Sequence, residues 1–155
     1  KRAKIDELDH INLGERNGEA RELAKEHAKL ILERPFTKPT LVFSGGETTV
    51  TVKGNGRGGR NCEYLLSLAI ALGENQNIYA IAADTDGIDG MEDNAGAMIA
   101  PDSLTRAEAL NLSLPDMLDN NDSYNAFKKL GDLITTGPTR TNVNDFRAIL
   151  VLPGN

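Results

Sequence analysis

The fold is decided by residues 78–90, which read Ile78-Tyr79-Ala80-Ile81-Ala82-Ala83-Asp84-Thr85-Asp86-Gly87-Ile88-Asp89-Gly90. The first six residues form a continuous apolar run of strand length. Such a run is typical of a strand that is buried on both faces, in a sheet that helices cover from both sides. The remaining residues are polar and contain two glycines, so the strand ends in a loop. We therefore expect residues 78–83 to form a central strand.

The segments on either side predict alternating helices and strands. An amphipathic helix is expected from Gly18 to Arg34, where Pro35 stops it, and a leucine-rich helix is expected just before the central strand. Further strands are expected at 40–43, 48–53, 133–135 and 146–152, and short helices at 104–110, 116–118 and 123–130. This order predicts an α/β fold, a three-layer α/β/α arrangement with a mixed sheet between helices. We expect residues 1–17 to be a boundary segment and residues 18–155 to be a single domain.

The composition excludes several classes of protein. The chain has 155 residues and a formal net charge of −6, and it lacks the basic stripe that contacts to a nucleic-acid backbone require. No apolar run approaches the roughly 20 residues that span a membrane, and the N-terminus has no apolar signal segment. We expect a cytoplasmic globular protein that binds neither nucleic acid nor membranes.

The stretch from Lys53 to Asn61 has the composition of an anion site. It contains four glycines together with Arg57 and Arg60. Glycines bring bare backbone N–H groups close to a ligand, and arginines grip phosphate or carboxylate oxygens with paired donors. If Asn61 caps the following helix, that helix directs its positive end at the same place. A plain turn remains an alternative, as does a structural ion pair between Arg60 and Glu63 or Glu47.

The loop after the central strand offers three carboxylates. Asp84, Asp86 and Asp89 lie within six residues, a spacing that allows two of them to hold Mg²⁺ directly or through water. Asp86 and Asp89 are the better candidates for metal ligands. The glutamate that closes an EF-hand loop is absent, because its position is occupied by Ala95. An Asp/Gly turn with capping carboxylates is the structural alternative.

Four polar, glycine-rich segments each follow a predicted strand: 44–47, 54–61, 84–90 and 136–145. Ligands bind at strand ends in open α/β sheets, so convergence of these segments would give a site for phosphate and a divalent cation. Glu47 is expected to pair with an arginine of the neighbouring loop. The Thr and Asn side chains of the last segment could orient a substrate or satisfy the backbone of their own loop.

The same four segments carry a family resemblance. The sequences 44–52, 56–61, 85–90, 136–139 and 141–145 together resemble the MOFRL domain, the C-terminal part of class II glycerate kinases, which are also labelled hydroxypyruvate reductases. The similarity runs in register from about Gly18 to Leu152. Cys62 stands where a glutamine is expected and Arg140 where a glycine is usual, which puts the backbone shape of the last loop in question.

The resemblance implies transfer of phosphate from ATP to D-glycerate with Mg²⁺, giving 2-phosphoglycerate, in a cleft shared with an N-terminal Rossmann-like domain that this chain lacks. Because phosphoryl transfer depends on positioning and charge neutralisation, the chain alone is expected to be inactive. The catalytic residues implied are Arg57, Arg60 and Asp86, and the metal ligands Asp86 and Asp89. The residues expected to bind substrate or phosphate are Ser44, Gly45, Gly46, Glu47, Gly56, Gly58, Gly59, Asn61, Thr139, Thr141, Asn142 and Asn144.

Two other functions remain open from the sequence. A hydroxypyruvate reductase would need a nicotinamide site, and the Gly/Arg loop is not expected to be a dinucleotide fingerprint, on the grounds that its spacing differs and that it follows an apparent hairpin. A stand-alone domain that binds an anionic metabolite is the third interpretation. A homodimer is compatible with each of these interpretations.

Overall fold

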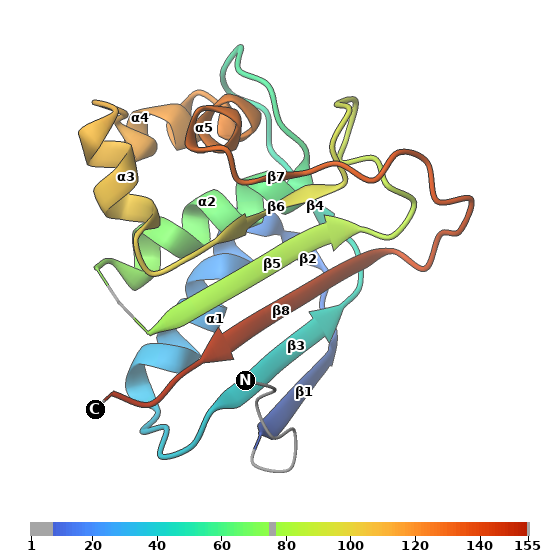
Figure 1. Cartoon of the computed structure of the whole chain (residues 1–155). Coiled ribbons are helices and arrows are strands. Elements are labelled where there is room, and N and C mark those ends of the chain that lie inside the picture. Colours follow the sequence, from blue (N-terminus) through green and yellow to red (C-terminus); the bar gives the residue numbers. More distant parts are fainter. Residues whose placement is uncertain (1–7, 75–76, 155) are drawn as a thin grey trace.

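A mixed sheet forms the centre of the computed structural model, which describes residues 8–74 and 77–154 (Figure 1). The six strands lie in the order β1-β3-β8-β5-β6-β7. Only β1 and β3 pair in parallel, and the other neighbours are antiparallel. The strands are β1 (Asp9–Glu15), β3 (Thr40–Gly45), β5 (Ile78–Asp84), β6 (Gly96–Ile99), β7 (Leu133–Ile134) and β8 (Asp145–Val151). The predicted α/β class with a mixed sheet is confirmed.

Two further short strands, β2 (Gly18–Glu19) and β4 (Thr48–Thr49), pair in parallel as a separate small sheet. Strand β4 covers only the start of the strand expected at 48–53, because residues 50–53 leave the extended pairing and enter the Gly/Arg loop. Strand β1 falls inside the segment expected to precede the domain. The main sheet therefore begins before Gly18.

The helices are α1 (Ala20–Glu33), α2 (Arg60–Leu72), α3 (Ser103–Ala109), α4 (Leu114–Asp119) and α5 (Ser123–Leu130). They lie on one face of the main sheet, with α2 against the strands and α1 beside it (Figure 1). Leu65, Leu66 and Leu68 are fully buried, which makes α2 the central helix of the core. None of the helices in the described part of the chain is long and apolar enough to cross a membrane.

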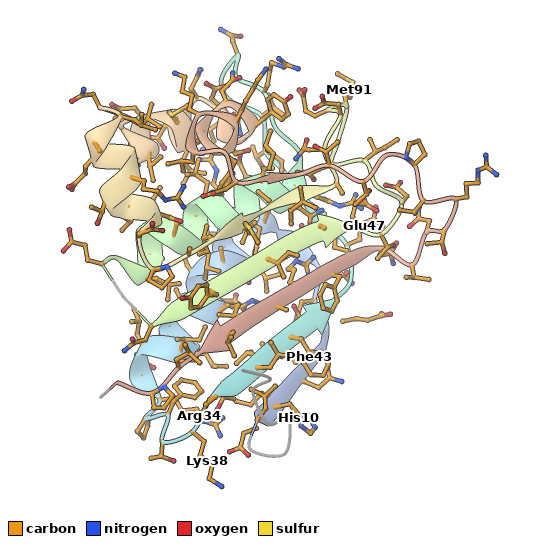
Figure 2. The ribbon with its side chains drawn as sticks, viewed as in Figure 1. His10, Arg34, Lys38, Phe43, Glu47 and Met91 are labelled. Atoms are coloured by element: carbon orange, nitrogen blue, oxygen red, sulfur yellow. The ribbon has the colours of Figure 1, made fainter. Side chains whose placement is uncertain are left out.

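The opposite face of the sheet differs from the expectation for residues 78–83. Burial alternates along β5: Ala80 and Ala82 are buried against the helices, whereas Tyr79 on the other face is 45% exposed. In the described residues no helix covers that second face. Alanine explains the difference, because its short side chain is compatible with either a covered or an uncovered face. An apolar run that contains three alanines therefore does not distinguish a strand buried on one face from a strand buried on both. Figure 2 shows His10 and Phe43 on this uncovered face.

Candidate functional site

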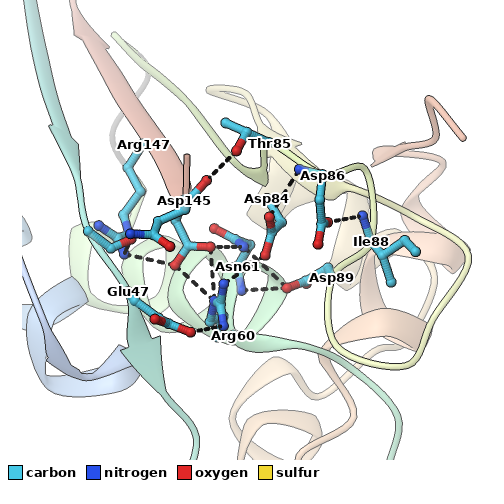
Figure 3. A network of polar contacts seen from close by, with 12 residues as sticks. Glu47, Arg60, Asn61, Asp84, Thr85, Asp86, Ile88, Asp89, Asp145 and Arg147 are labelled. Carbon is cyan, nitrogen blue, oxygen red and sulfur yellow. Dashed lines mark hydrogen bonds and ion pairs between the residues drawn. The ribbon is translucent and has the colours of Figure 1, made fainter. Parts of the chain in front are cut away.

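Arg60 is the centre of a polar network at one edge of the main sheet (Figure 3). Its Nε donates to both oxygens of Asp145, at 2.9 and 3.0 Å. Its two terminal nitrogens donate to Glu47 Oε1 at 3.0 Å and to Asp84 Oδ2 at 2.7 Å. Burial lowers the pKa of Arg60, but the hydrogen bonds and charge of Asp145 outweigh burial and raise it above its usual value. The guanidinium is therefore a permanent cation held by three carboxylates.

Three chain segments supply these carboxylates. Glu47 follows β3, Asp84 ends β5, and Asp145 begins β8, so the ends of neighbouring strands meet at Arg60. Arg60 itself is the first residue of α2. The predicted pairing of Arg60 with Glu47 is confirmed, whereas Glu63 is bonded to Arg21 instead.

Asp145 is the most connected member of the network. Its carboxylate is buried and also accepts hydrogen bonds from Asn61 Nδ2 at 2.9 Å and from the Arg147 guanidinium at 3.1 Å. Arg147 in turn donates to the carbonyl of Gly45, and the amide of Asp145 donates to that of Gly46. The polar loop after β3 is thus fixed to the start of β8 from two sides.

The loop after β5 has two parts with different environments. Asp84 is buried; burial raises its pKa, and the amide of Asp86 and the charge of Arg60 oppose that rise. Asp86 is more accessible, and its Oδ1 accepts a hydrogen bond from the amide of Ile88. In the described structure its second oxygen, Oδ2, has no hydrogen-bond partner. Asp86 is therefore the acidic residue of this loop that is best placed to meet a ligand.

Asp89 caps helix α2. It is fully buried, and its two oxygens accept hydrogen bonds from the amides of Asn61 and Cys62, each at 2.9 Å. Asn61 is therefore inside the first turn and the N-cap residue is Gly59, so the prediction that Asn61 caps this helix is wrong. The same contacts favour a capping role for Asp89 over the metal-ligand role predicted for it, because both oxygens are occupied and no solvent reaches them.

The Gly/Arg loop docks onto the turn between α4 and α5. Asn121 Oδ1 accepts the amides of Lys53 and Gly54, at 2.7 and 2.9 Å. The amides of Asn55 and Gly56 bond to Asn120, and that of Arg57 to Asp122. The backbone donors that the sequence suggested for an anion are therefore engaged from residue 53 to residue 57.

Close approach explains the glycines of this loop. A Cβ on Gly54 would lie 2.4 Å from the carbonyl oxygen of Asn120, and one on Gly56 would lie 2.5 Å from the backbone of Asp122. A Cβ on Gly58 would meet the hydroxyl of Ser123 at 2.1 Å, and one on Gly59 would meet Asp89 at 2.4 Å. Contacts of this length leave no room for a side chain at the glycine positions. The structure of residues 53–57 therefore fits the interpretation as a structural loop and not as an anion site.

Arg57 points away from Arg60. Its guanidinium pairs with Glu92 at 2.5 Å and lies over the ring of Tyr124, 4.6 Å from the centroid. The side chain is 54% exposed. The two arginines of the predicted anion clamp therefore do not converge on one ligand.

The last loop folds back on the loop after β5. The hydroxyl of Thr85 donates to the carbonyl of Asn144 at 2.7 Å and accepts the amide of Val143 at 2.9 Å. The amide of Thr139 donates to the carbonyl of Asp86, while Asn142 Oδ1 accepts the amide of Asn144. Thr141 and the side chains around it are exposed. Thr and Asn thus satisfy their own loops here, and the exposed side chains line the outer rim of the network.

Arg140 adopts the conformation that its glycine-like position requires. Its φ is 62°, in the left-handed region where glycine is normally preferred. The glycine expected at this place would enter that region without a steric penalty. The departure from the family pattern therefore leaves the loop shape intact and adds an exposed cation.

Two loops of the predicted site, 44–47 and 84–86, meet at Arg60, and the loop 136–145 meets them through Thr85 and Asp145. Ser44 is buried at the end of β3, and Gly46 has a φ of 99° with Arg16 packed against it. Sequence reasoning missed the central role of Asp145 and the partnership of Asn120, Asn121 and Asp122 with the Gly/Arg loop. The sequence signal for the second of these was the run of three polar residues in the turn between the two helices. In the structure one of them, Asn121, is buried.

The carboxylates of this loop decide how well a divalent cation would fit here. Within residues 8–74 and 77–154, no three His, Cys, Asp or Glu side chains are arranged to enclose a metal ion. Mg²⁺ in phosphoryl-transfer sites is held by one or two carboxylates, and phosphate oxygens and water complete the octahedron. Asp86, with its unpartnered Oδ2, fits such a partial site. Asp89 does not fit, because both of its oxygens accept amides at the start of α2.

The comparisons with known proteins match this domain as a whole. The model of the MOFRL family matches residues 40–145, which include every segment of the site. The chain belongs to the MOFRL family. Among its relatives, a putative hydroxypyruvate reductase of Agrobacterium vitis is 52% identical over 141 residues, covering 86% of this chain and 32% of that protein. The D-glycerate 2-kinase of Thermotoga maritima is 47% identical over 132 residues, covering 82% of this chain and 32% of the kinase.

A solved structure agrees with the sequence comparison. The crystal structure of a glycerate kinase from Thermotoga maritima superposes with a TM-score of 0.88 and 42% identity, over 94% of this chain and 36% of that chain. The MOFRL chain described here thus spans about a third of the length of the relatives it matches.

Proposed function

We propose that this chain is the MOFRL part of a glycerate 2-kinase, which transfers phosphate from ATP to D-glycerate to give 2-phosphoglycerate. The observation that carries the proposal is the overall match to a glycerate kinase structure at 42% identity, combined with the network around Arg60 at the strand ends. The remaining two thirds of such an enzyme, including an N-terminal Rossmann-like domain, would supply the other side of the cleft.

The network assigns different tasks to its members. Arg60 is held by Glu47, Asp84 and Asp145, so it positions these carboxylates instead of gripping a free anion. Glu47 projects toward solvent with 59% of its side chain exposed, which makes it the member that can meet a substrate hydroxyl or a metal-bound water. This positioning would reduce the conformational freedom of Glu47 before substrate binds.

Asp86 is the proposed contact to Mg²⁺, which would neutralise charge on the transferring phosphate when bound. The donor is an oxygen, the group accepts no competing hydrogen bond at Oδ2 within the described residues, and the loop around it is fixed by Thr139 and Thr85. Thr141, Asn142 and the exposed Arg140 would line the substrate side of the cleft. The cation of Arg140 is available for a carboxylate or phosphate group there.

Hydroxypyruvate reduction is the second candidate, because two relatives carry that name. The expectation that the glycine spacing differs from a dinucleotide fingerprint is wrong, because Gly54, Gly56 and Gly59 follow the G-x-G-x-x-G pattern ahead of helix α2. In a dinucleotide site such glycines let the pyrophosphate approach the backbone. Here Gly54 and Gly56 are packed against Asn120 and Asp122, and the amides are bonded to the same turn. This geometry favours the kinase over the reductase.

A chimera tests the proposal directly. The matched C-terminal third of the Thermotoga maritima D-glycerate 2-kinase is replaced by this chain, and ADP formation is measured with ATP, Mg²⁺ and D-glycerate. We expect D-glycerate-dependent ADP formation by the chimera and none by this chain alone. NADH oxidation with hydroxypyruvate is the parallel assay. A folded chimera that forms no ADP, or one that oxidises NADH, would overturn the proposal.

A further inference from the structure

Arg147 is a charged side chain buried between the main sheet and helix α2. It is 1% exposed, and strand register places it between Ser44 of β3 and Ala82 of β5. Both neighbours are small and buried, which leaves room for the guanidinium. Its Nε has no hydrogen-bond partner in the described part of the chain. Burying a cation is costly, and apolar side chains of similar volume are often as stable in such a place, so stability alone does not account for an arginine here.

The guanidinium of Arg147 holds the polar loop after β3. Its terminal nitrogens donate to the carbonyl of Gly45 at 2.8 Å and to that of Gly46 at 3.4 Å. One of them also donates to Asp145 Oδ2 at 3.1 Å. The two carbonyls belong to the peptide units just before Glu47, and Asp145 belongs to the network in Figure 3. Arg147 is therefore bonded both to the loop that carries Glu47 and to the network that this carboxylate joins.

Helices α1 and α2 fix the orientation of this guanidinium. Tyr64 of α2 is fully buried, and Cζ of Arg147 lies over its ring, 5.5 Å from the centroid. The hydroxyl of Tyr64 is 2.8 Å from Nδ1 of His27 on α1, and His27 is buried as well. Guanidinium groups are attracted to aromatic faces. The packing thus directs the guanidinium toward the loop before any ligand binds.

We propose that Arg147 is a positioning residue of the kinase site, an inference that rests on the proposed function. It sets the position of the loop 44–47 and of Asp145, and through them the direction of the Glu47 carboxylate. With 1% of its side chain exposed, Arg147 does not touch substrate and acts only through the groups that it holds. Lysine would not replace it, because an ammonium lacks the planar fork that reaches two carbonyls and a carboxylate.

Amide hydrogen exchange, followed by NMR in this chain, tests the structural step without an assay of activity. Wild type is compared with Arg147→Lys and Arg147→Met. The amides of Asp145 and Arg16 report on the loop, because they donate to the carbonyls of Gly46 and Gly45. Amides in the middle of β5 report global unfolding in the same sample.

Two choices of variant separate positioning from general destabilisation. Arg147→Met leaves no unpaired charge, because Asp145 keeps two other side-chain donors. Arg106→Lys is the matched control, because Arg106 on α3 also donates to a backbone carbonyl and to a carboxylate. These acceptors, Leu130 and Asp132, lie outside the network. Circular dichroism establishes that each variant is folded.

We expect exchange at Asp145 and Arg16 to accelerate by about tenfold or more in both Arg147 variants, as the loss of buried hydrogen bonds implies, while the β5 amides change less. Arg106→Lys should leave both reporter amides at wild-type rates. Unchanged exchange in the Arg147 variants would overturn the proposal, because Arg147 would then not hold the loop. An equal acceleration in β5 would overturn it too, because Arg147 would then only stabilise the fold.

The chimera with the Thermotoga maritima kinase tests the functional step. Both kcat and the KM for D-glycerate are measured for the unsubstituted chimera and for the same three variants. We expect kcat to fall by about tenfold to a hundredfold for Arg147→Lys and Arg147→Met, with little change in KM, because misplaced groups lose contacts made in the transition state. Arg106→Lys should keep the kcat of the unsubstituted chimera.

The outcomes separate this inference from the proposed function. An unchanged kcat in a folded Arg147 variant of an active chimera, or a loss confined to KM, would overturn the positioning role and leave the kinase function standing. An inactive unsubstituted chimera would overturn the proposed function, and hydrogen exchange would still decide whether Arg147 holds the loop.

Discussion

Arg57 and Arg60 lie three residues apart in one glycine-rich motif, yet the structure uses them in opposite ways. Arg57 is half-exposed and makes an ion pair with Glu92 beside the ring of Tyr124. Arg60 enters a buried network and holds carboxylates from three strand ends. The difference arises from the chain on each side of them. The first arginine belongs to a loop that docks on the α4–α5 turn, whereas the second is the first residue of the central helix. Residue type and spacing do not distinguish the two arginines. The start of helix α2 separates the half of the motif that joins the carboxylate network from the half that docks on the α4–α5 turn.

The largest expected effect is on the Arg60 side. Asp145→Ala removes the acceptor shared by Arg60, Asn61 and Arg147 and leaves the buried Arg147 without its carboxylate. Loss of one partner from a buried ion pair typically costs 3–5 kcal/mol, and we expect about that decrease in the free energy of unfolding. Urea denaturation of this chain measures it. Asp116→Ala, on the exposed first turn of α4, is the control and should change stability by less than about 1 kcal/mol.

The second effect tests the supporting loop. Gly54→Ala places a Cβ 2.4 Å from the carbonyl of Asn120, so the loop must move away from the α4–α5 turn. Overpacking of this kind costs about 1–3 kcal/mol, and we expect a value near 2 kcal/mol in urea denaturation. In Gly45→Ala the nearest atom lies at 3.5 Å, an ordinary contact, so its effect should be clearly smaller. Equal stability of Gly54→Ala and wild type would show that the glycine is not required for docking.

The third prediction concerns the buried His27 and the pH dependence of the free energy of unfolding. His27 is buried beside Tyr64, at 2.8 Å from its hydroxyl, and burial, with the charges of Arg147 and Arg16, lowers its pKa from 6.5 to about 4. Between these values the unfolded chain binds the proton more tightly, so stability rises with pH. The contribution is complete above about pH 6.5 and is lost progressively as the pH falls toward 4.

Buried carboxylates act in the opposite direction in part of that range, because burial raises the pKa of Glu63 and Asp84. The measurement therefore compares wild type with His27→Gln by urea denaturation at about pH 7.5 and pH 5. We expect wild type to lose about 2 kcal/mol more than the variant over this interval, from the pKa difference of His27 alone. Identical pH profiles would mean that the pKa of His27 is the same in the folded and the unfolded chain.

The smallest effect is expected for Arg57→Ala. The Arg57 side chain is 54% exposed in its pair with Glu92, and ion pairs with such an exposed partner add little to stability. We expect a melting temperature close to that of wild type, measured by circular dichroism, whereas Asp145→Ala melts far lower. A large loss for Arg57→Ala would show that its contacts with Glu92 and Tyr124 hold the loop in place, and would remove the distinction from Arg60.

The sequence predicted the class of fold, and it predicted that polar loops gather at the strand ends, for clear physical reasons. The amphipathic period predicted the long helix that the structure has at 20–33. The apolar run before Asp84 predicted the central strand and the polar loop that follows it. The bare second face escaped prediction because alanine is small enough for either environment. The capping role of Asp89 and the hub role of Asp145 also escaped it, because each depends on a contact between residues far apart in the chain: Asp89 to Asn61, and Asp145 to Arg60.

The central claim is that the network around Arg60, and not the Arg57 side of the motif, serves the reaction. The most direct test is to measure kcat for D-glycerate-dependent ADP formation in the chimera with the Thermotoga maritima kinase, carrying Arg60→Ala or Arg57→Ala. The account predicts a fall of roughly a hundredfold or more for Arg60→Ala, the size seen when a preorganised polar group is lost, and less than about tenfold for Arg57→Ala. An active Arg60→Ala chimera, or one in which Arg57→Ala alone abolishes turnover, would contradict it.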